Sequence, residues 1–337
     1  MALVTLTNPS TLEGTTHVAF DMGTIRRLTE MGARNVVPAA ENPLVGPCRL
    51  DPQEDRQVQA AWWGLSETPW DQLYALDVRW EPPVVVWVST NPQERLDLFR
   101  TCSWLDHLGL SHRDVIILEF EGQPAEDPWV AKYRCCERVS DHPAEVLLAR
   151  LAEGRPWPRA RYQRAVDLWH RYVDADPSRF ARTCARGLAG FPELALIWAI
   201  TSNFFPRRTA DGILHLSRYD ELLLRRLSYD SDPVYIFARG PDPWMGLGFC
   251  TGDLFTPFRL DHWATHGTRP VVERAPGRGR PEHLMRRYTY RITKYGKQLR
   301  RALTDLADAP RLPVGGAEAY APEAPWVLCD DGRLVRL

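Results

Sequence analysis

The first half of the chain places acidic, hydroxyl and amide side chains directly after short apolar runs, where they could carry chemistry. These residues are Asp21, Thr24, Asn42, Ser89, Thr90 and Asn91. A carboxylate such as Asp21 can transfer protons as a catalytic acid or base, or bind a ribose hydroxyl. Hydroxyl and amide groups can donate hydrogen bonds to an anion, which the unpaired N–H groups of a helix N-terminus also bind. We therefore expect Asp21 to be catalytic and the other five residues to bind substrate.

A structural role competes with this interpretation after the run that ends at Ser89. The sequence Asn91-Pro92-Gln93-Glu94 has a capping residue, a proline at the first helical position and a glutamate at the third. This pattern is typical of the start of a helix. We expect Glu94 to stabilise that helix start, whereas Asn91 either only caps the helix or also contacts a ligand.

The elements that position these residues alternate between strand and helix. Short apolar runs predict strands at His17–Phe20, Asn35–Ala39, Val84–Ser89 and Val115–Phe120. Helical spacing predicts helices at about 24–32, 53–63, 69–77 and 92–108. This alternation predicts a mostly parallel sheet covered by helices on both faces, with ligands bound beyond the carboxyl ends of the strands. No Gly-x-Gly-x-x-Gly turn follows a strand, so the sequence does not support a dinucleotide cofactor and identifies no other.

The second half of the chain differs in charge and in pattern. Residues 1–142 contain 12 basic and 21 acidic side chains, whereas residues 143–337 contain 30 basic and 22 acidic ones. From Pro143 onward, prolines precede segments with helical spacing. We expect a Rossmann-like three-layer α/β domain at 1–125, a junction at 126–142, and a mainly helical domain at 143–337 that ends in a winged-helix-like module.

The winged-helix expectation rests on the most basic part of the chain, residues 268–301, where 11 basic side chains stand against two acidic ones. A Gly- and Arg-rich segment at 276–281 is predicted to be the tip between two short strands, near 270–273 and 288–292. Thr293 is then placed to cap a closing helix that runs through Leu306.

The arginines of this basic wing could contact the phosphates of a nucleic acid. They are Arg278, Arg280, Arg286, Arg287 and Arg291. The charge could equally form a solvated face or bind the acidic first domain. The candidate recognition helix around 254–264 carries one arginine against two aspartates, which is poorly suited to reading a major groove.

Composition excludes several classes of protein. With 337 residues, 44% of them hydrophobic, the chain can bury a core without disulfides or structural metals. The longest uncharged apolar stretch, Leu194 to Phe205, is too short to span a bilayer, and residues 1–25 lack a secretory signal. The seven cysteines have no metal-like spacing, so we expect reduced thiols, a cytoplasmic protein, no metal site and no membrane partner.

Short segments spread over most of the chain resemble an uncharacterised bacterial family, the domain of unknown function 1835 with its companion, the domain of unknown function 3658. The segments are His17–Phe20, Leu44–Pro47, Trp62-Trp63, Val85–Asn91 with Glu94, Phe191-Pro192, Leu216–Arg218, Gly252-Asp253, Tyr290–Gly296, Gly315-Gly316 and Gly332–Val335. The chain departs from the family pattern at Asp21-Met22 and at Val88–Thr90, where that family carries Gly-Asp and His-Gly-Asp. The resemblance implies an architecture and a functional face, but no reaction.

The sequence supports two main functional classes and leaves a third open. The leading expectation is a small-molecule enzyme or ligand-binding protein, acting on a phosphorylated or nucleotide-like metabolite in a pocket above the strand ends at the domain interface. The alternative is a nucleic-acid-binding regulator that uses the basic wing at 268–301. A protein-interaction scaffold is the second alternative.

Overall fold

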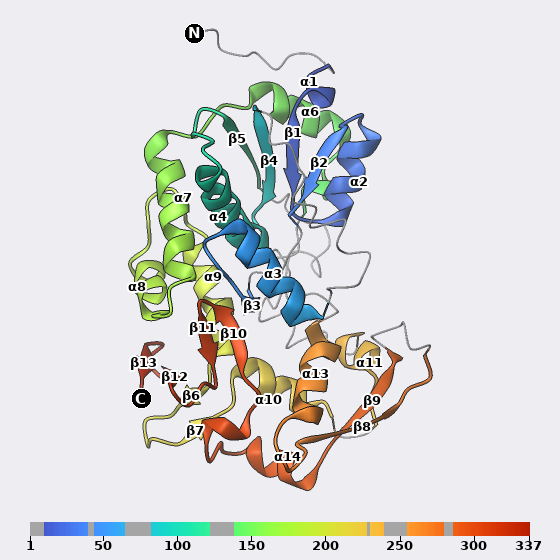
Figure 1. The fold of residues 1–337 in the computed structure, drawn as a ribbon, viewed down its shortest axis with the longest axis vertical. Helices are drawn as coiled ribbons and strands as arrows, with labels where there is room; N and C mark the ends of the chain where they lie inside the picture. The colour runs from blue at the N-terminus through green and yellow to red at the C-terminus, as the bar shows by residue number, and fades with distance from the viewer. Residues whose placement is uncertain are drawn as a thin grey trace. The chain divides into compact units, whose positions relative to one another are not determined.

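The structure is a computed structural model (Figure 1). It describes residues 10–39, 44–64, 82–121, 138–227, 230–238, 255–279 and 286–337. The chain divides into two compact units. The first contains Met1–Pro43, Cys48–Val173 and Ala189–Glu193, and the second contains Leu44–Pro47, Asp174–Leu188 and Leu194–Leu337. The helix predicted at 69–77 lies outside the described residues.

A four-stranded sheet forms the centre of the first unit. Its strands, in spatial order, are β2 (Asn35–Pro38), β1 (Thr16–Ala19), β4 (Val84–Ser89) and β5 (Val115–Phe120). Every neighbouring pair is parallel. All four lie where the sequence predicts them, and the parallel α/β architecture of this part of the chain is confirmed.

Three helices of the first unit begin where a short polar side chain accepts a hydrogen bond from the first turn. The helices of this unit are α1 (Ser10–Glu13), α2 (Met22–Glu30), α3 (Pro52–Trp63), α4 (Pro92–His107), the 3-10 helix η3 (Val139–Asp141), α6 (Ala144–Glu153) and α7 (Arg159–Tyr172). Asp21, Asp51 and Asn91 cap α2, α3 and α4 through their side-chain oxygens. These local bonds explain why the predicted helix starts agree with the structure within about two residues.

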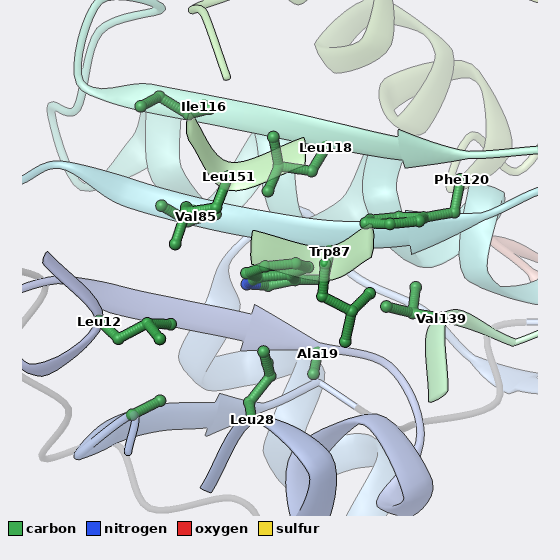
Figure 2. Close-up of a cluster of buried hydrophobic side chains, with 12 residues drawn as sticks. Leu12, Ala19, Leu28, Val85, Trp87, Ile116, Leu118, Phe120, Val139 and Leu151 are labelled. Atoms are coloured by element: carbon green, nitrogen blue, oxygen red, sulfur yellow. The ribbon is translucent and has the colours of Figure 1, made fainter. Parts of the chain in front are cut away.

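One face of the sheet carries the hydrophobic cluster shown in Figure 2. Strand residues at every second position, such as Val85 and Trp87, point into it together with Leu28 of α2. The rings of Trp87 and Phe120 stack with their centroids 5.8 Å apart. Helices α2 and α6 therefore form one outer layer, since Leu151 of α6 belongs to the same cluster.

The opposite face of the sheet is covered by α4 and α7. Glu119 of β5, which points away from the cluster, pairs with Arg95 of α4 and Arg161 of α7. Tyr162 of α7 donates a hydrogen bond of 3.0 Å to the carbonyl oxygen of Cys102 in α4. The first unit thus has three layers, and it extends to Val173, beyond the predicted limit at 125 and junction at 126–142. The extension follows from α6 and α7, whose apolar faces are buried against the sheet and α4.

The second unit contains more strand than the sequence indicates. Its helices are α8 (Ser178–Arg186), α9 (Leu194–Thr201), the 3-10 helix η4 (Ser202–Phe204), α10 (Arg218–Arg225), α11 (Pro233–Ala238), α13 (Phe255–Thr265), α14 (Lys294–Leu299) and the 3-10 helix η6 (Leu306–Asp308). Its strands are β3 (Gly46–Pro47), β6 (Arg207–Arg208), β7 (Leu214–His215), β8 (Val272–Pro276), β9 (Tyr288–Ile292), β10 (Leu312–Gly315), β11 (Ala317–Ala319), β12 (Trp326–Cys329) and β13 (Leu334–Arg336).

These strands form three small sheets, with the orders β11-β10-β3, β13-β12-β6-β7 and β8-β9. The expectation of a mainly helical segment after the junction misses the last two hairpins, β10-β11 and β12-β13. Both turn at glycines with positive φ, Gly315 at 61° and Gly332 at 78°. Strands of three or four residues are too short for their alternation to be recognised in the sequence.

The hairpin predicted in the basic wing is present. Strands β8 and β9 pair antiparallel, with Val272 opposite Ile292. Thr293 caps α14 by accepting a hydrogen bond of 3.0 Å from the N–H of Gly296. Helix α14 ends at Leu299 rather than at Leu306, and the winged-helix module as a whole stays a prediction.

A buried ion pair joins separate segments of the second unit. The Asp220 carboxylate of α10 accepts two hydrogen bonds of 2.8 Å from the guanidinium of Arg259 in α13. It also accepts bonds of 2.8 Å from Trp263 Nε1 and from the hydroxyl of Tyr320. Burial alone would raise the pKa of Asp220, but the charge of Arg259 and these donors hold that pKa below its ordinary value. The four side chains therefore link α10, α13 and the segment after β11.

Candidate functional site

The predicted site residues of the first unit meet at the carboxyl ends of two adjacent strands. In the parallel register Ala19 of β1 lies opposite Trp87 of β4. Asp21 and Ser89 follow these residues at the same distance along the chain, so both lie at the same edge of the sheet. The loop after the neighbouring strand β2 contains Asn42, which lies outside the described residues.

Asp21 is the N-cap of α2, and its carboxylate is engaged by Thr24. Its Oδ1 atom accepts a hydrogen bond of 2.9 Å from the N–H of Thr24, and its Oδ2 atom accepts one from the Thr24 hydroxyl. Thr24 is fully buried. Thr24 was predicted to bind substrate, but in the structure it positions the Asp21 carboxylate.

The residues after β4 start helix α4. Ser89 Oγ accepts a hydrogen bond of 3.1 Å from the N–H of Asn91, and Asn91 Oδ1 accepts one of 2.9 Å from the N–H of Gln93. The capping role predicted for Asn91 is confirmed. Within the described part of the chain, Asn91 Nδ2 and the Thr90 hydroxyl have no hydrogen-bond partner, so both donors are available to a ligand.

Glu94 is the residue whose environment the sequence does not predict. We expected it to stabilise the start of its own helix, but its Oε2 atom accepts a hydrogen bond of 2.8 Å from the backbone N–H of Ser89, at the end of β4. The side chain is buried. Burial raises the pKa of Glu94 to about 7, and the negative charge of Asp21 adds to this effect, while the Ser89 hydrogen bonds and the Arg138 charge oppose it. A carboxyl group with this pKa can both donate and accept a proton at neutral pH.

The segment at η3 forms a further wall beside Asp21. A Cβ atom at Gly23 would lie 2.7 Å from Ser140 Oγ and 2.9 Å from Asp21 Oδ1. Any larger residue at position 23 would therefore require the side chain of Ser140 or Asp21 to shift. Ser140 and Arg138 fall in the predicted junction, because nothing local in 126–142 indicates that the chain returns to the sheet edge.

The last strand of the sheet contributes a carboxylate that is already neutralised. Glu119 Oε1 lies 2.6 Å from Arg95 Nη1, and Glu119 Oε2 lies 2.8 Å from Arg161 Nη1. Burial alone would raise the pKa of Glu119, but the two arginines hold it below its ordinary value. Glu119 is therefore an ion-paired carboxylate that joins β5, α4 and α7, whereas Glu94 has no comparable ion pair among the described residues.

The arginines of the basic wing lie on the β8-β9 hairpin of the second unit. Arg278, Arg286 and Arg287 are exposed, whereas Arg291 pairs with Glu273 at 2.9 Å. Arg280 lies outside the described residues.

Buried His17 lies in β1 but takes no part in the site. Its Nδ1 atom accepts a hydrogen bond of 3.0 Å from Trp87 Nε1, and its Nε2 atom lies 3.1 Å from the carbonyl oxygen of Leu12. Burial lowers the pKa of His17, so the neutral ring with hydrogen on Nε2 fits these contacts. Within the described ranges, no group of three or more His, Cys, Asp or Glu side chains could hold a metal ion, and no helix has the length and apolar character needed to cross a membrane.

Comparison of the chain with protein-family models, with curated proteins and with solved structures found no significant match. The resemblance to the domain of unknown function 1835 stays a prediction. Function is therefore inferred from the residues at the sheet edge.

Proposed function

We propose that this protein is an enzyme that binds a small anionic metabolite at the carboxyl edge of its parallel sheet and uses Glu94 as a general acid–base. The observation that carries the proposal is the position of the Glu94 carboxyl group. It is buried beside the charge of Asp21 at the edge where parallel α/β sheets bind ligands. A carboxyl group whose pKa lies near the working pH is suited to proton transfer.

The available donors favour a ligand with a phosphate or carboxylate group. Asn91 Nδ2 and the Thr90 hydroxyl lie at the N-terminus of α4, a helix of 16 residues. A long helix favours anions at this end because its unpaired N–H groups carry partial positive charge. An anionic group held there would place the rest of the metabolite beside Glu94. This supports the phosphorylated or nucleotide-like metabolite expected from the sequence.

A thermal-shift panel of sugar phosphates, nucleotides and other metabolite phosphates tests the proposal. We expect one chemical class to raise the melting temperature of the wild-type chain. Asn91→Asp should lose this shift, because a carboxylate replaces the amide donor. Glu94→Gln should keep the shift and abolish turnover of the same compound. Absence of any shift across the panel would contradict the proposal.

Nucleic-acid binding is the second candidate, supported by the β8-β9 hairpin. Arg278, Arg286 and Arg287 are exposed there and have no acidic partner in the described ranges. Neutralising phosphate contacts would make such binding strongly dependent on salt. We expect Arg286→Gln/Arg287→Gln to weaken retardation of duplex DNA by the full chain at low salt. Failure of the wild-type chain to retard DNA under these conditions would remove this candidate.

A further inference from the structure

The second unit contains an open cavity of about 610 Å³ that none of the functions above uses. Its lining residues are Arg207, Thr209, His215, Arg218, Glu221, Arg225, Arg300 and Arg301. The volume lies in the range of small-molecule pockets. Most such pockets are mainly apolar. This one, here called the arginine pocket, is lined by charged side chains, with five guanidinium groups and one carboxylate.

Three segments far apart in the sequence build the arginine pocket. Helix α10 presents Arg218, Glu221 and Arg225 on one face, because residues three and four apart are neighbours on a helix. The β6-β7 hairpin adds Arg207, which pairs in register with His215. The chain after α14 is tied to β7 by a hydrogen bond of 2.9 Å from the N–H of Leu303 to the carbonyl oxygen of Leu214, which places Arg300 and Arg301 at the pocket.

Glu221 orders three of the arginines. Its Oε2 atom lies 2.5 Å from Arg207 Nη2 and 3.4 Å from Arg218 Nη1, and its Oε1 atom accepts a hydrogen bond from Arg225. Arg207 also donates through Nε to the carbonyl oxygen of Leu216 at 3.2 Å. One carboxylate thus holds three guanidinium groups in place but neutralises only one positive charge.

The remaining two lining arginines, Arg300 and Arg301, add further positive charge to the pocket. Arg300 and Arg301 form no ion pair with any residue that the structure describes. A concave surface lined by one sign of charge concentrates counter-ions. Guanidinium groups match phosphate oxygens in geometry and bind them through two parallel hydrogen bonds. The pocket therefore offers both the charge and the donor arrangement for several phosphate groups.

We propose that the arginine pocket binds a compact anion with two or more linked phosphate groups. A single phosphate or carboxylate would leave much of the excess positive charge uncompensated. Among the described lining residues there is no Phe, Tyr or Trp, and the imidazole of His215 is the one aromatic ring, so the pocket offers little of the stacking surface on which proteins bind the bases of single-stranded nucleic acids. The ligand class is thus inorganic di- or triphosphate, or the polyphosphate end of a metabolite. The inference is independent of the site at Glu94, which lies in the other unit.

Calorimetric titration of the full chain with inorganic tripolyphosphate tests this inference. We expect saturable binding at one site per chain, weakening as salt is added, and weaker binding of orthophosphate. Arg300→Gln/Arg301→Gln should raise the Kd for tripolyphosphate at least tenfold. A nucleoside triphosphate that binds as tightly as tripolyphosphate would show that linked phosphates are the recognised group. Clearly weaker binding of the nucleoside triphosphate would overturn the extension to metabolite ends.

Two further variants test whether a general loss of positive charge, or misfolding, could account for weaker binding. Arg26→Gln/Arg34→Gln removes the same charge from two exposed side chains of the first unit and should leave the Kd unchanged. Arg225→Gln changes a single, largely exposed pocket arginine and should weaken binding without loss of structure. Equal weakening by the control, or binding that does not saturate, would overturn the inference. Tighter binding of an oligonucleotide that is lost in the Arg300/Arg301 variant would overturn it in favour of a nucleic-acid surface.

Discussion

The backbone N–H of Ser89 donates a hydrogen bond of 2.8 Å to Oε2 of Glu94, and this bond ties the end of strand β4 to the first turn of helix α4. The carboxyl group is thereby held at the edge of the sheet rather than in solvent. Its raised pKa follows from that position and has consequences for stability that can be measured without knowing the ligand.

Glu94→Gln should change how stability depends on pH. The folded state binds a proton at Glu94 up to about pH 7, whereas the unfolded chain releases it near the ordinary glutamate pKa of 4.5. The folded state therefore holds more protons than the unfolded state in this window, and wild-type stability falls as the pH rises through it. Glutamine can still accept the Ser89 bond but does not titrate. Relative to wild type, the variant should gain about 2 kcal/mol of unfolding free energy between pH 5 and pH 8.

Urea denaturation at several pH values measures this difference. Glu54→Gln is the matched control, because Glu54 occupies the same third position of helix α3 but is exposed. The control should show no comparable dependence on pH. An identical pH profile for wild type and Glu94→Gln would contradict the assignment of the raised pKa.

Asp21→Asn should lower the pKa of Glu94. The substitution removes the negative charge that raises this pKa and keeps helix α2 capped, since asparagine caps about as well as aspartate. Carboxyl-carbon NMR titration of Glu94 measures the shift directly. Asp51→Asn makes the same change at the cap of α3 and should leave the Glu94 titration where it is. A shift of equal size in both variants would argue against a local charge effect.

Substitutions at Asn91 distinguish its role in capping helix α4 from a role in ligand binding. Asn91→Asp should keep the melting temperature within a few degrees, because both side chains accept the Gln93 N–H bond. Asn91→Ala should cost about 1 kcal/mol, the usual value of a lost cap. If only the Nδ2 donor contacts the ligand, the aspartate variant loses ligand-induced stabilisation while its own stability is retained. Full retention of that stabilisation would remove Asn91 from the site.

The Asp220–Arg259 ion pair should be the most sensitive polar contact of the second unit. Both side chains are fully buried, so Arg259→Gln leaves the Asp220 carboxylate without its counter-charge. We expect a loss of about 3–5 kcal/mol in unfolding free energy. Arg311→Gln breaks only exposed ion pairs with Glu318 and Glu323 and should cost less than about 1 kcal/mol. Denaturant titrations of the two variants compare them, and similar losses would contradict the burial argument.

Local sequence determines much of the first unit. The strands at Val84–Ser89 and Val115–Phe120 are predicted because short apolar runs rich in β-branched and aromatic residues are typical of buried strands. The start of α4 is predicted because Asn91 and Pro92 act on the backbone within one turn. These interactions join residues that are close in the chain, so they can be predicted from the sequence alone.

The tertiary structure decides which residues become neighbours across the chain. Helix α6 belongs with the sheet because Leu147 and Leu151 bury their side chains against it, which no local pattern in the segment specifies. The arginine pocket forms only because separate segments converge around Glu221. Glu94 shows, at a single residue, which properties the sequence predicts and which the folded structure decides. Its helical position can be predicted from the sequence, but its pKa depends on burial and on the charge of Asp21, and both are long-range properties of the folded chain.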